Sequence, residues 1–283
     1  MKKLVTLLLT ISMALICLSG CKQQETAYAN KLEEIQAKGV LVLATSPDYA
    51  PMEFIDPNKS GQEQYVGSDI ALAKYIAEAL GVTLEIKAMD FDAVLTAIST
   101  DNADIAISGF GWKQEREDNY ELSIGYNQDG ESSCQGLMVK ADQVENYKTL
   151  ADFNGKKIVA QPGSLQEGYV KEQIEDAEIT LMSTLDAALM MLKTDKVDGF
   201  ACSCDQIYVY QNSNPDLAKA TPEFDTTLED MHAGNVLAVK KGETELIAKI
   251  NEILAQVNES GIYQTWSDEA KAIGKALGMD FEE

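Results

Sequence analysis

Hydrophobic and polar positions in the first half of the chain switch repeatedly between the period of a strand and that of a helix. The apolar segments expected to form strands are 39–46, 82–89 and 104–108, and those expected to form helices are 67–81 and 90–103. Ser68 or Asp69 is expected to cap the first of these helices and Gly81 to end it. This alternation predicts a βαβα unit with a mostly parallel sheet.

The same alternation starts again in the second half. Expected strands are 137–141, 156–161, 178–182 and 197–202, and expected helical segments are 149–155, 164–174 and 184–196. A last strand (235–242) and a helical stretch (244–270), broken near Gly261, can rejoin the first unit. We therefore expect two lobes that the chain crosses between twice, with lobe 1 formed by 38–126 plus 235–283 and lobe 2 by 127–234.

The N-terminus has the pattern of an export signal. A basic start precedes an apolar run of residues 4–18, which is short for a membrane span. The next residues, Leu18 to Cys21, resemble a bacterial lipobox. We therefore expect residues 1–20 to be a lipoprotein signal peptide, with diacylglycerol on the sulfur of Cys21 and residues 21–37 as a polar tether. The alternative is an ordinary secretory peptide.

Charge and cysteine content limit the classes of partner. The chain has 23 basic and 46 acidic side chains, a net charge of −23, which argues against binding nucleic acid or anionic lipid. Besides Cys21, the exported chain has Cys134, Cys202 and Cys204, an odd number that leaves at least one thiol free. Cys202 and Cys204 would share one face of a strand. A disulfide from Cys134 to either one and buried free thiols both remain open.

No cofactor or metal site is expected. The cysteine spacing is not C-x2-C, and the single histidine, His232, lies far along the chain. The sequence also has no nucleophile elbow, P-loop or zinc signature, so we assign no catalytic residues.

Several stretches occur in an order and spacing that resemble one protein family. They are SPDYAPMEF, VGSDIALAKYIAEALG, FDAVLTAI, ADIAISGF followed by QER, VAQPGSLQE, KVDGF and LAVKKG, within residues 38–268. This set resembles the bacterial extracellular solute-binding proteins of family 3, the substrate-binding lipoproteins of amino acid ABC importers. The resemblance implies the type 2 periplasmic-binding-protein fold: two α/β lobes, each a mostly parallel sheet flanked by helices, joined by two hinge crossings. It also implies a ligand at the carboxyl ends of the strands and closure of the lobes around it.

Arg116 is the single arginine of the chain. A guanidinium can hold both oxygens of a carboxylate, whereas lysine is a point charge. Arg116 also falls where the family has its carboxylate-binding arginine. The alternative is a solvated ion pair with the neighbouring acids Glu115, Glu117 or Asp118.

The resemblance implies further ligand contacts. The residues at matching positions are Tyr49, Phe91, Ser108, Gly109, Gly111, Gln161, Ser164 and Leu165. Gly109 and Gly111 would offer backbone N–H groups to the carboxylate, although many relatives have Ser or Thr in place of Gly111. Ser164 also has the position of the N-cap in a capping box with Glu167, and capping alone could explain why serine occurs here.

The expected site for a ligand ammonium departs from the family pattern. The position of the usual acid is Ser203, and Asp205 lies two residues further on, on the same face of a continuing strand. Either residue could meet the ammonium, or the ligand is not a simple α-amino acid. Ser46 likewise replaces an acid of many relatives, and Asp48 and Glu53 could compensate.

The function we expect is capture of a polar, cationic or sulfur-containing amino acid by a monomer held on the outer face of the cell membrane by its lipid. The partners implied are an ABC permease and its ATPase subunit. The alternatives are a ligand-sensing module without transport and a dehydratase-like enzyme on the same fold.

Overall fold

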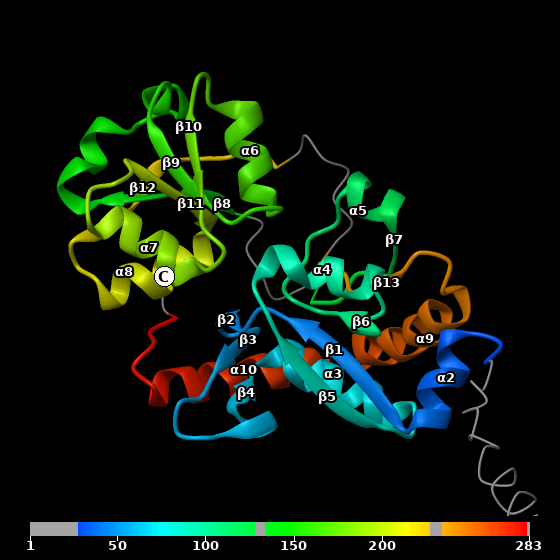
Figure 1. Ribbon diagram of the computed structural model, residues 1–283. Helices are drawn as coiled ribbons and strands as arrows, with labels where there is room; N and C mark the ends of the chain where they lie inside the picture. The colour runs from blue at the N-terminus through cyan, green and yellow to red at the C-terminus, as the bar shows by residue number, and fades with distance from the viewer. Residues whose placement is uncertain (1–27, 128–133, 227–233, 282–283) are drawn as a thin grey trace, which may run out of the picture.

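The computed structural model describes residues 28–127, 134–226 and 234–281. The segment expected to be a signal peptide, Cys21 and His232 lie outside these residues. Two five-stranded sheets form two lobes, and a third, three-stranded sheet is smaller. Figure 1 shows the lobes side by side, with the green and yellow middle of the chain forming one lobe and the blue-to-teal and orange-to-red helices and strands forming the other. Within the described part of the chain, no helix is long and apolar enough to cross a membrane.

Lobe 1 contains the sheet in the order β5-β1-β6-β13-β7. Its strands are β1 (Val40–Thr45), β5 (Thr83–Ala88), β6 (Ile105–Ala106), β7 (Tyr120–Leu122) and β13 (Ala238–Lys240). Strand β1 is parallel to β5 and β6, whereas β13 runs antiparallel to β6 and β7. Because β13 comes from the C-terminal part of the chain, lobe 1 is built from two separate stretches of sequence.

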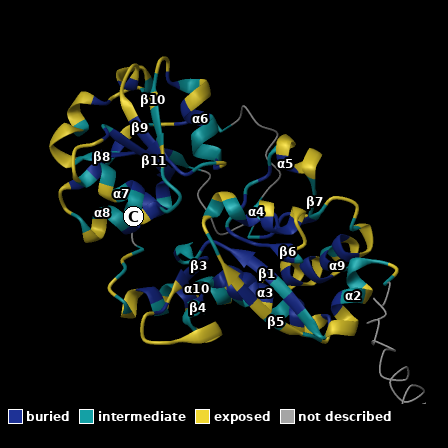
Figure 2. Cartoon of the chain, viewed as in Figure 1, coloured by how far each residue is buried: buried dark blue, intermediate teal, exposed yellow. Residues whose placement is uncertain are grey.

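The two faces of this sheet are covered by different helices. Leu41 and Leu43 pack with helices α3 (Ser68–Ala79) and α9 (Thr244–Ser260), whereas Val42 and Ala44 face α4 (Phe91–Ser99). Successive residues of a strand point to opposite faces, so an uninterrupted apolar run is what a doubly covered strand requires. Figure 2 shows the buried strands between partly exposed helices. The last helix, α10 (Ile262–Ala276), follows the predicted break at Gly261, which has a φ of 64°.

The predicted tether extends too far along the chain. Helix α2 (Lys31–Lys38) is capped by the side chain of Asn30, and its Ile35 is only 1% exposed within the core of lobe 1. Residues 31–37 are therefore part of the lobe.

Lobe 2 contains the sheet in the order β10-β9-β11-β8-β12. Its strands are β8 (Gln135–Lys140), β9 (Lys157–Ala160), β10 (Glu178–Leu181), β11 (Gly199–Ser203) and β12 (Leu217–Glu223). Strands β9, β10 and β11 are parallel, β8 pairs antiparallel with β11, and β12 pairs antiparallel with β8. The flanking helices are α6 (Leu165–Gln173), α7 (Leu185–Lys193) and α8 (Cys204–Ser213). The fold class is thus the predicted one, with antiparallel strands in both lobes.

The remaining elements lie outside the two large sheets and their flanking helices. They are β2 (Asp48–Tyr49), β3 (Glu53–Ile55), β4 (Tyr65–Val66), α5 (Gln114–Asn119) and the 3-10 turns Gly61–Gln64, Ala141–Asn146 and Leu150–Phe153. Tyr126 and Asn235 pair with each other as an isolated β-bridge, where the two connections between the lobes run side by side.

Two local predictions are wrong. The N-cap of α3 is Gly67, because Ser68 and Asp69 are already helical and buried. Strand β11 ends at Ser203 and Cys204 begins helix α8, so neither Cys202 with Cys204 nor Ser203 with Asp205 shares a strand face.

Candidate functional site

A cavity of about 160 Å³ lies between the lobes. A cavity of about 150 Å³ in another protein holds benzene, so this one has room for a small organic molecule. Its lining comes from both lobes and from the two connections: Asp48, Tyr49, Glu53, Phe91, Ser108, Gly109, Gly111, Arg116, Asn127, Gln135, Gln161, Ser164, Leu165, Gln166, Leu185, Ala201, Cys202, Ser203, Gly234 and Asn235. All of the predicted ligand contacts except Asp205 belong to this set.

Arg116 lies at the seam between the lobes. Its side chain is 5% exposed, and its guanidinium carbon is 5.0 Å from the centre of the Phe110 ring. The guanidinium donates to the carbonyl of Gly111 (2.5 Å) in lobe 1 and to that of Gly163 (2.9 Å) in lobe 2. The alternative expected from the sequence, an ion pair exposed to solvent, does not fit this buried side chain. A buried cation at a cavity wall is a fitting partner for a ligand anion.

Gly109 lines the cavity, but its N–H donates to Asp69 Oδ2 (3.0 Å). The predicted hydrogen bond from this N–H to a ligand carboxylate therefore does not fit the structure. Ser108 is similarly engaged, since its hydroxyl donates to Glu53 Oε1 (3.0 Å) and accepts from Ser46 N (3.0 Å). Both residues shape the cavity through contacts within lobe 1.

Glu53, which lines the cavity, forms a buried carboxyl pair with Asp69. Asp69 accepts from three donors: Gly109 N, Tyr126 Oη (2.9 Å) and Tyr263 Oη (2.6 Å). Among the described residues Glu53 Oε2 meets no donor, and the carboxylate of Asp69 is its neighbour. Burial first, and then the charge of Asp69, raises the pKa of Glu53 well above its usual range. Glu53 is thus the protonated member of the pair.

The N-terminus of helix α6 faces the cavity from lobe 2. Ser164 is its N-cap: the hydroxyl accepts from Glu167 N (3.1 Å) and donates to the carbonyl of Gln161 (2.8 Å). The predicted capping role is therefore confirmed, although Glu167 accepts from Gly163 N rather than from Ser164 N. The first amides of a helix attract anions, so Leu165 N and Arg116 can serve the same carboxylate.

Gly111 approaches lobe 2 closely. A Cβ atom added here would lie 2.6 Å from Leu165 Cδ1. Leu165 therefore occupies the space that a hydroxyl-bearing side chain at position 111 would need, which is a physical reason for glycine. Trp112, the next residue, packs in the core of lobe 1 and does not line the cavity.

Tyr49 and Phe91 are two aromatic walls of the cavity. The hydroxyl of Tyr49 donates to Ser203 Oγ (2.7 Å) across the interface between the lobes. Phe91 packs against Phe110 with ring centres 5.1 Å apart. Since Phe110 also lies under Arg116, the aromatic wall and the cation form one packed unit.

Ser203 lines the cavity, whereas Asp205 does not. Ser203 is the N-cap of α8, its hydroxyl accepting from Gln206 N (3.3 Å), and Asp205 lies in the first turn of that helix. Of the two residues considered for the ligand ammonium, only Ser203 is at the cavity.

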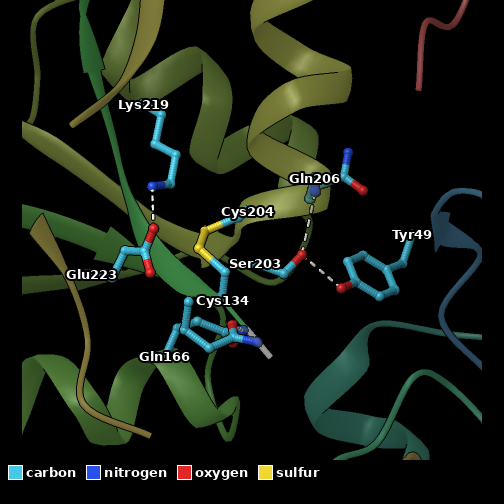
Figure 3. The surroundings of a disulfide bond; sticks show 9 residues. Tyr49, Cys134, Gln166, Ser203, Cys204, Gln206, Lys219 and Glu223 are labelled. Atoms are coloured by element: carbon cyan, nitrogen blue, oxygen red, sulfur yellow. Dashed lines mark hydrogen bonds and ion pairs between the residues drawn. A yellow bond between two sulfur atoms is a disulfide. The ribbon is translucent and has the colours of Figure 1, made fainter. Parts of the chain in front are cut away.

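A disulfide joins Cys134 to Cys204 and supports this wall (Figure 3). It ties the start of β8 to the start of α8, next to Ser203. Gln135 and Gln166, which line the cavity nearby, are hydrogen-bonded to each other (2.5 Å). Cys202 is buried as a free thiol, and burial raises its pKa, so the thiol stays protonated.

Several lining residues have no counterpart in the sequence prediction. They are Asn127, Gln135, Gln166, Leu185, Ala201, Cys202, Gly234 and Asn235. The predicted hinge crossings at 127 and 234 are the signal that could have indicated Asn127, Gly234 and Asn235. Nothing in the sequence indicates Leu185, because this residue contributes to the site through its backbone N–H, which donates to Asp48.

The chain is similar to known solute-binding proteins. Residues 41–270 match the model of the bacterial extracellular solute-binding proteins, family 3. In structure it is similar to an amino acid ABC transporter substrate-binding protein from Streptococcus pneumoniae bound to L-arginine, with a TM-score of 0.76 and 33% identity over 89% of this chain and 99% of that one.

Curated relatives differ in the ligand that they are named for. The ABC transporter arginine-binding protein 1 of Escherichia coli is 27% identical over 79% of this chain and 87% of its own length. The L-cystine-binding protein TcyJ of the same species is 21% identical over 90% and 91%. The matched family model spans most of the chain and agrees with the two-lobed fold and its cavity, so the chain belongs to the bacterial extracellular solute-binding proteins of family 3.

Proposed function

We propose that this protein binds a free amino acid between its lobes and delivers it to an ABC importer. The observation that carries the proposal is the position of Arg116, a buried guanidinium at the cavity wall next to the N-terminus of α6. Together they can bind an α-carboxylate, the group that all amino acids share.

The other walls suggest which amino acids fit. Tyr49 and Phe91 line the cavity with aromatic rings, and aromatic faces attract cations as well as apolar groups. Similar proteins are named for arginine and for cystine, so the candidates are cationic, polar and sulfur-containing amino acids.

The wider role follows from the family and from the N-terminus. Lipid on Cys21 would hold a monomer on the outer face of the cell membrane, where the closed form meets the permease. The ATPase subunit supplies the energy, so this chain needs neither cofactor nor catalysis. The similar proteins described above are named as binding proteins, which favours this role over an enzyme. A ligand-sensing module without transport is the alternative.

A thermal-shift screen tests the proposal. The chain without its first 27 residues is unfolded and refolded to remove bound ligand, then melted with each amino acid and with small amines. A ligand at 100 times its Kd should stabilise the fold by about 2.7 kcal/mol. Arg116→Lys should lose that shift, and Glu117→Gln, an exposed neighbour in the same helix, should keep it. If no compound with an α-carboxylate raises Tm, or if Arg116→Lys binds equally well, the proposal is wrong.

A further inference from the structure

We propose that Asp48 closes the two lobes on each other and does not bind the ligand's cation. Its carboxylate belongs to lobe 1 but accepts a hydrogen bond from the first backbone N–H of helix α7 in lobe 2. The inference rests on the proposed function in one respect: an amino acid ligand is used to measure closure.

The hydrogen bonds of Asp48 run mainly across the interface. Oδ2 accepts from Leu185 N (2.9 Å) and from Gln161 Nε2 (3.2 Å), both in lobe 2. Oδ1 accepts from Ser46 Oγ (3.0 Å) in lobe 1. Each carboxylate oxygen therefore already has at least one donor, although the side chain lines the cavity.

Helix α7 has a first-turn amide that its own residues do not satisfy. The side chain of Thr184, the N-cap, accepts from Ala187 N (3.2 Å). Leu185, the first residue of the helix, donates its N–H to Asp48. Amides at a helix N-terminus have no acceptor within the helix and favour a negative charge. Asp48 supplies that charge only when the lobes are together.

Gln161 holds the same contact from lobe 2. Its amide nitrogen has two hydrogens, and it donates to Asp48 Oδ2 and to the carbonyl of Ser183 (3.2 Å). Both N–H groups of this amide are thus hydrogen-bonded within the protein. The predicted role of Gln161 as a ligand contact becomes one of positioning Asp48.

The two roles of an acid at this position differ in their effect on selectivity. An acid that binds a ligand cation strengthens the binding of cationic ligands alone. An acid that stabilises the closed form strengthens every ligand by the same factor, because every ligand needs that form. Loss of a hydrogen-bonded charge of this kind corresponds to a fall in affinity of about 10- to 100-fold.

Isothermal titration calorimetry separates the two roles. Asp48→Ala and Asp48→Asn are titrated with a cationic and an uncharged amino acid found by the screen, after thermal melts establish that both variants fold. We expect both affinities to fall by a common factor, less in the asparagine variant, which keeps an acceptor. The matched control is Asp186→Asn, which removes an exposed acid from the same helix turn whose partner, Tyr210 Oη, lies within lobe 2. This variant should bind like the wild type. A fall confined to the cationic ligand, or no fall, overturns the proposal.

Failure of the proposed function gives a different result. If no amino acid binds, small-angle X-ray scattering of the ligand-free proteins tests Asp48 directly. A larger radius of gyration for Asp48→Ala than for wild type and Asp186→Asn supports closure by Asp48. Equal radii overturn it.

Discussion

Gly111 lies close to Leu165 of the other lobe, and a methyl group added there should weaken closure without unfolding either lobe. The new Cβ would lie 2.6 Å from Leu165 Cδ1 and 3.6 Å from its Cγ. Carbon atoms pack best at about 3.5–4.0 Å, so the first contact is repulsive. Gly111 does not have a positive φ, so alanine fits the backbone itself.

Leu165 Cδ1 is the end of a half-buried side chain that can turn aside, so the cost should lie at the low end of the range for overpacking, about 1 kcal/mol. Because Gly111 and Leu165 belong to different lobes, this cost falls on the closed form. The affinity of Gly111→Ala for its amino acid should therefore drop about 5-fold, and the Tm of the ligand-free protein should change little. Removing the opposing side chain with Leu165→Ala should restore much of the loss.

The assay is a double-mutant cycle of calorimetric Kd values for Gly111→Ala and Leu165→Ala. A coupling of about 0.5–3 kcal/mol is expected for residues in contact. Gly168→Ala is the control, because its added Cβ would lie 3.6 Å from Lys113 Nζ, an ordinary contact across the same interface. Additive effects of the two substitutions, or an equal loss in Gly168→Ala, would refute the interpretation of Gly111 as a close point between the lobes.

Three further predictions concern the fold around the site. Because burial raises the pKa of Glu53, the folded state keeps a proton that the unfolded state loses above about pH 4.3. The unfolding free energy should therefore fall as pH rises from there toward the pKa of Glu53 in the folded state. Urea titrations at several pH values should show a smaller fall for Glu53→Gln than for the wild type. An equal dependence of unfolding free energy on pH in the two proteins would contradict a protonated Glu53. Ile35→Ala should destabilise lobe 1 by about 2–5 kcal/mol in urea, whereas Gln36→Ala, at an exposed position, should not. Equal urea midpoints for the two variants would mean that α2 is not part of the lobe. Cys134→Ser opens a loop spanning 70 residues and should lower stability in urea by about 4 kcal/mol relative to the oxidised wild type; no change would mean that the disulfide does not form.

The parts of the fold that could be predicted are those with a strong period in the sequence. Strand β1 is apolar from residue 40 to residue 44 because both faces of its sheet are covered, and the break at Gly261 separates α9 from α10 as expected. Helix α2 was missed because half of KLEEIQAK is charged and only Ile35 is buried. The helical start of α8 at Cys204 was missed because Ser203, its N-cap, directly continues a strand pattern.

The site could be predicted as a set of residues but not as a set of bonds. The family pattern places Arg116, Tyr49 and Ser203 at the cavity, since the order of strands and loops fixes where they lie. The destination of a hydrogen bond depends on distant parts of the chain: Asp48 meets Leu185, which lies 137 residues away. The N–H of Gly109 is likewise taken by Asp69, a residue that the sequence indicated only as a helix cap.

The most direct measurement compares the amino acid identified by the screen with its carboxamide by isothermal titration calorimetry of the refolded, ligand-free protein. The two ligands differ only in the group that Arg116 is expected to hold. Leaving a buried charge without its partner costs about 3–5 kcal/mol, so the carboxamide should bind at least about 100-fold more weakly. Equal affinities would show that the cavity does not recognise the carboxylate and would contradict the role given to Arg116.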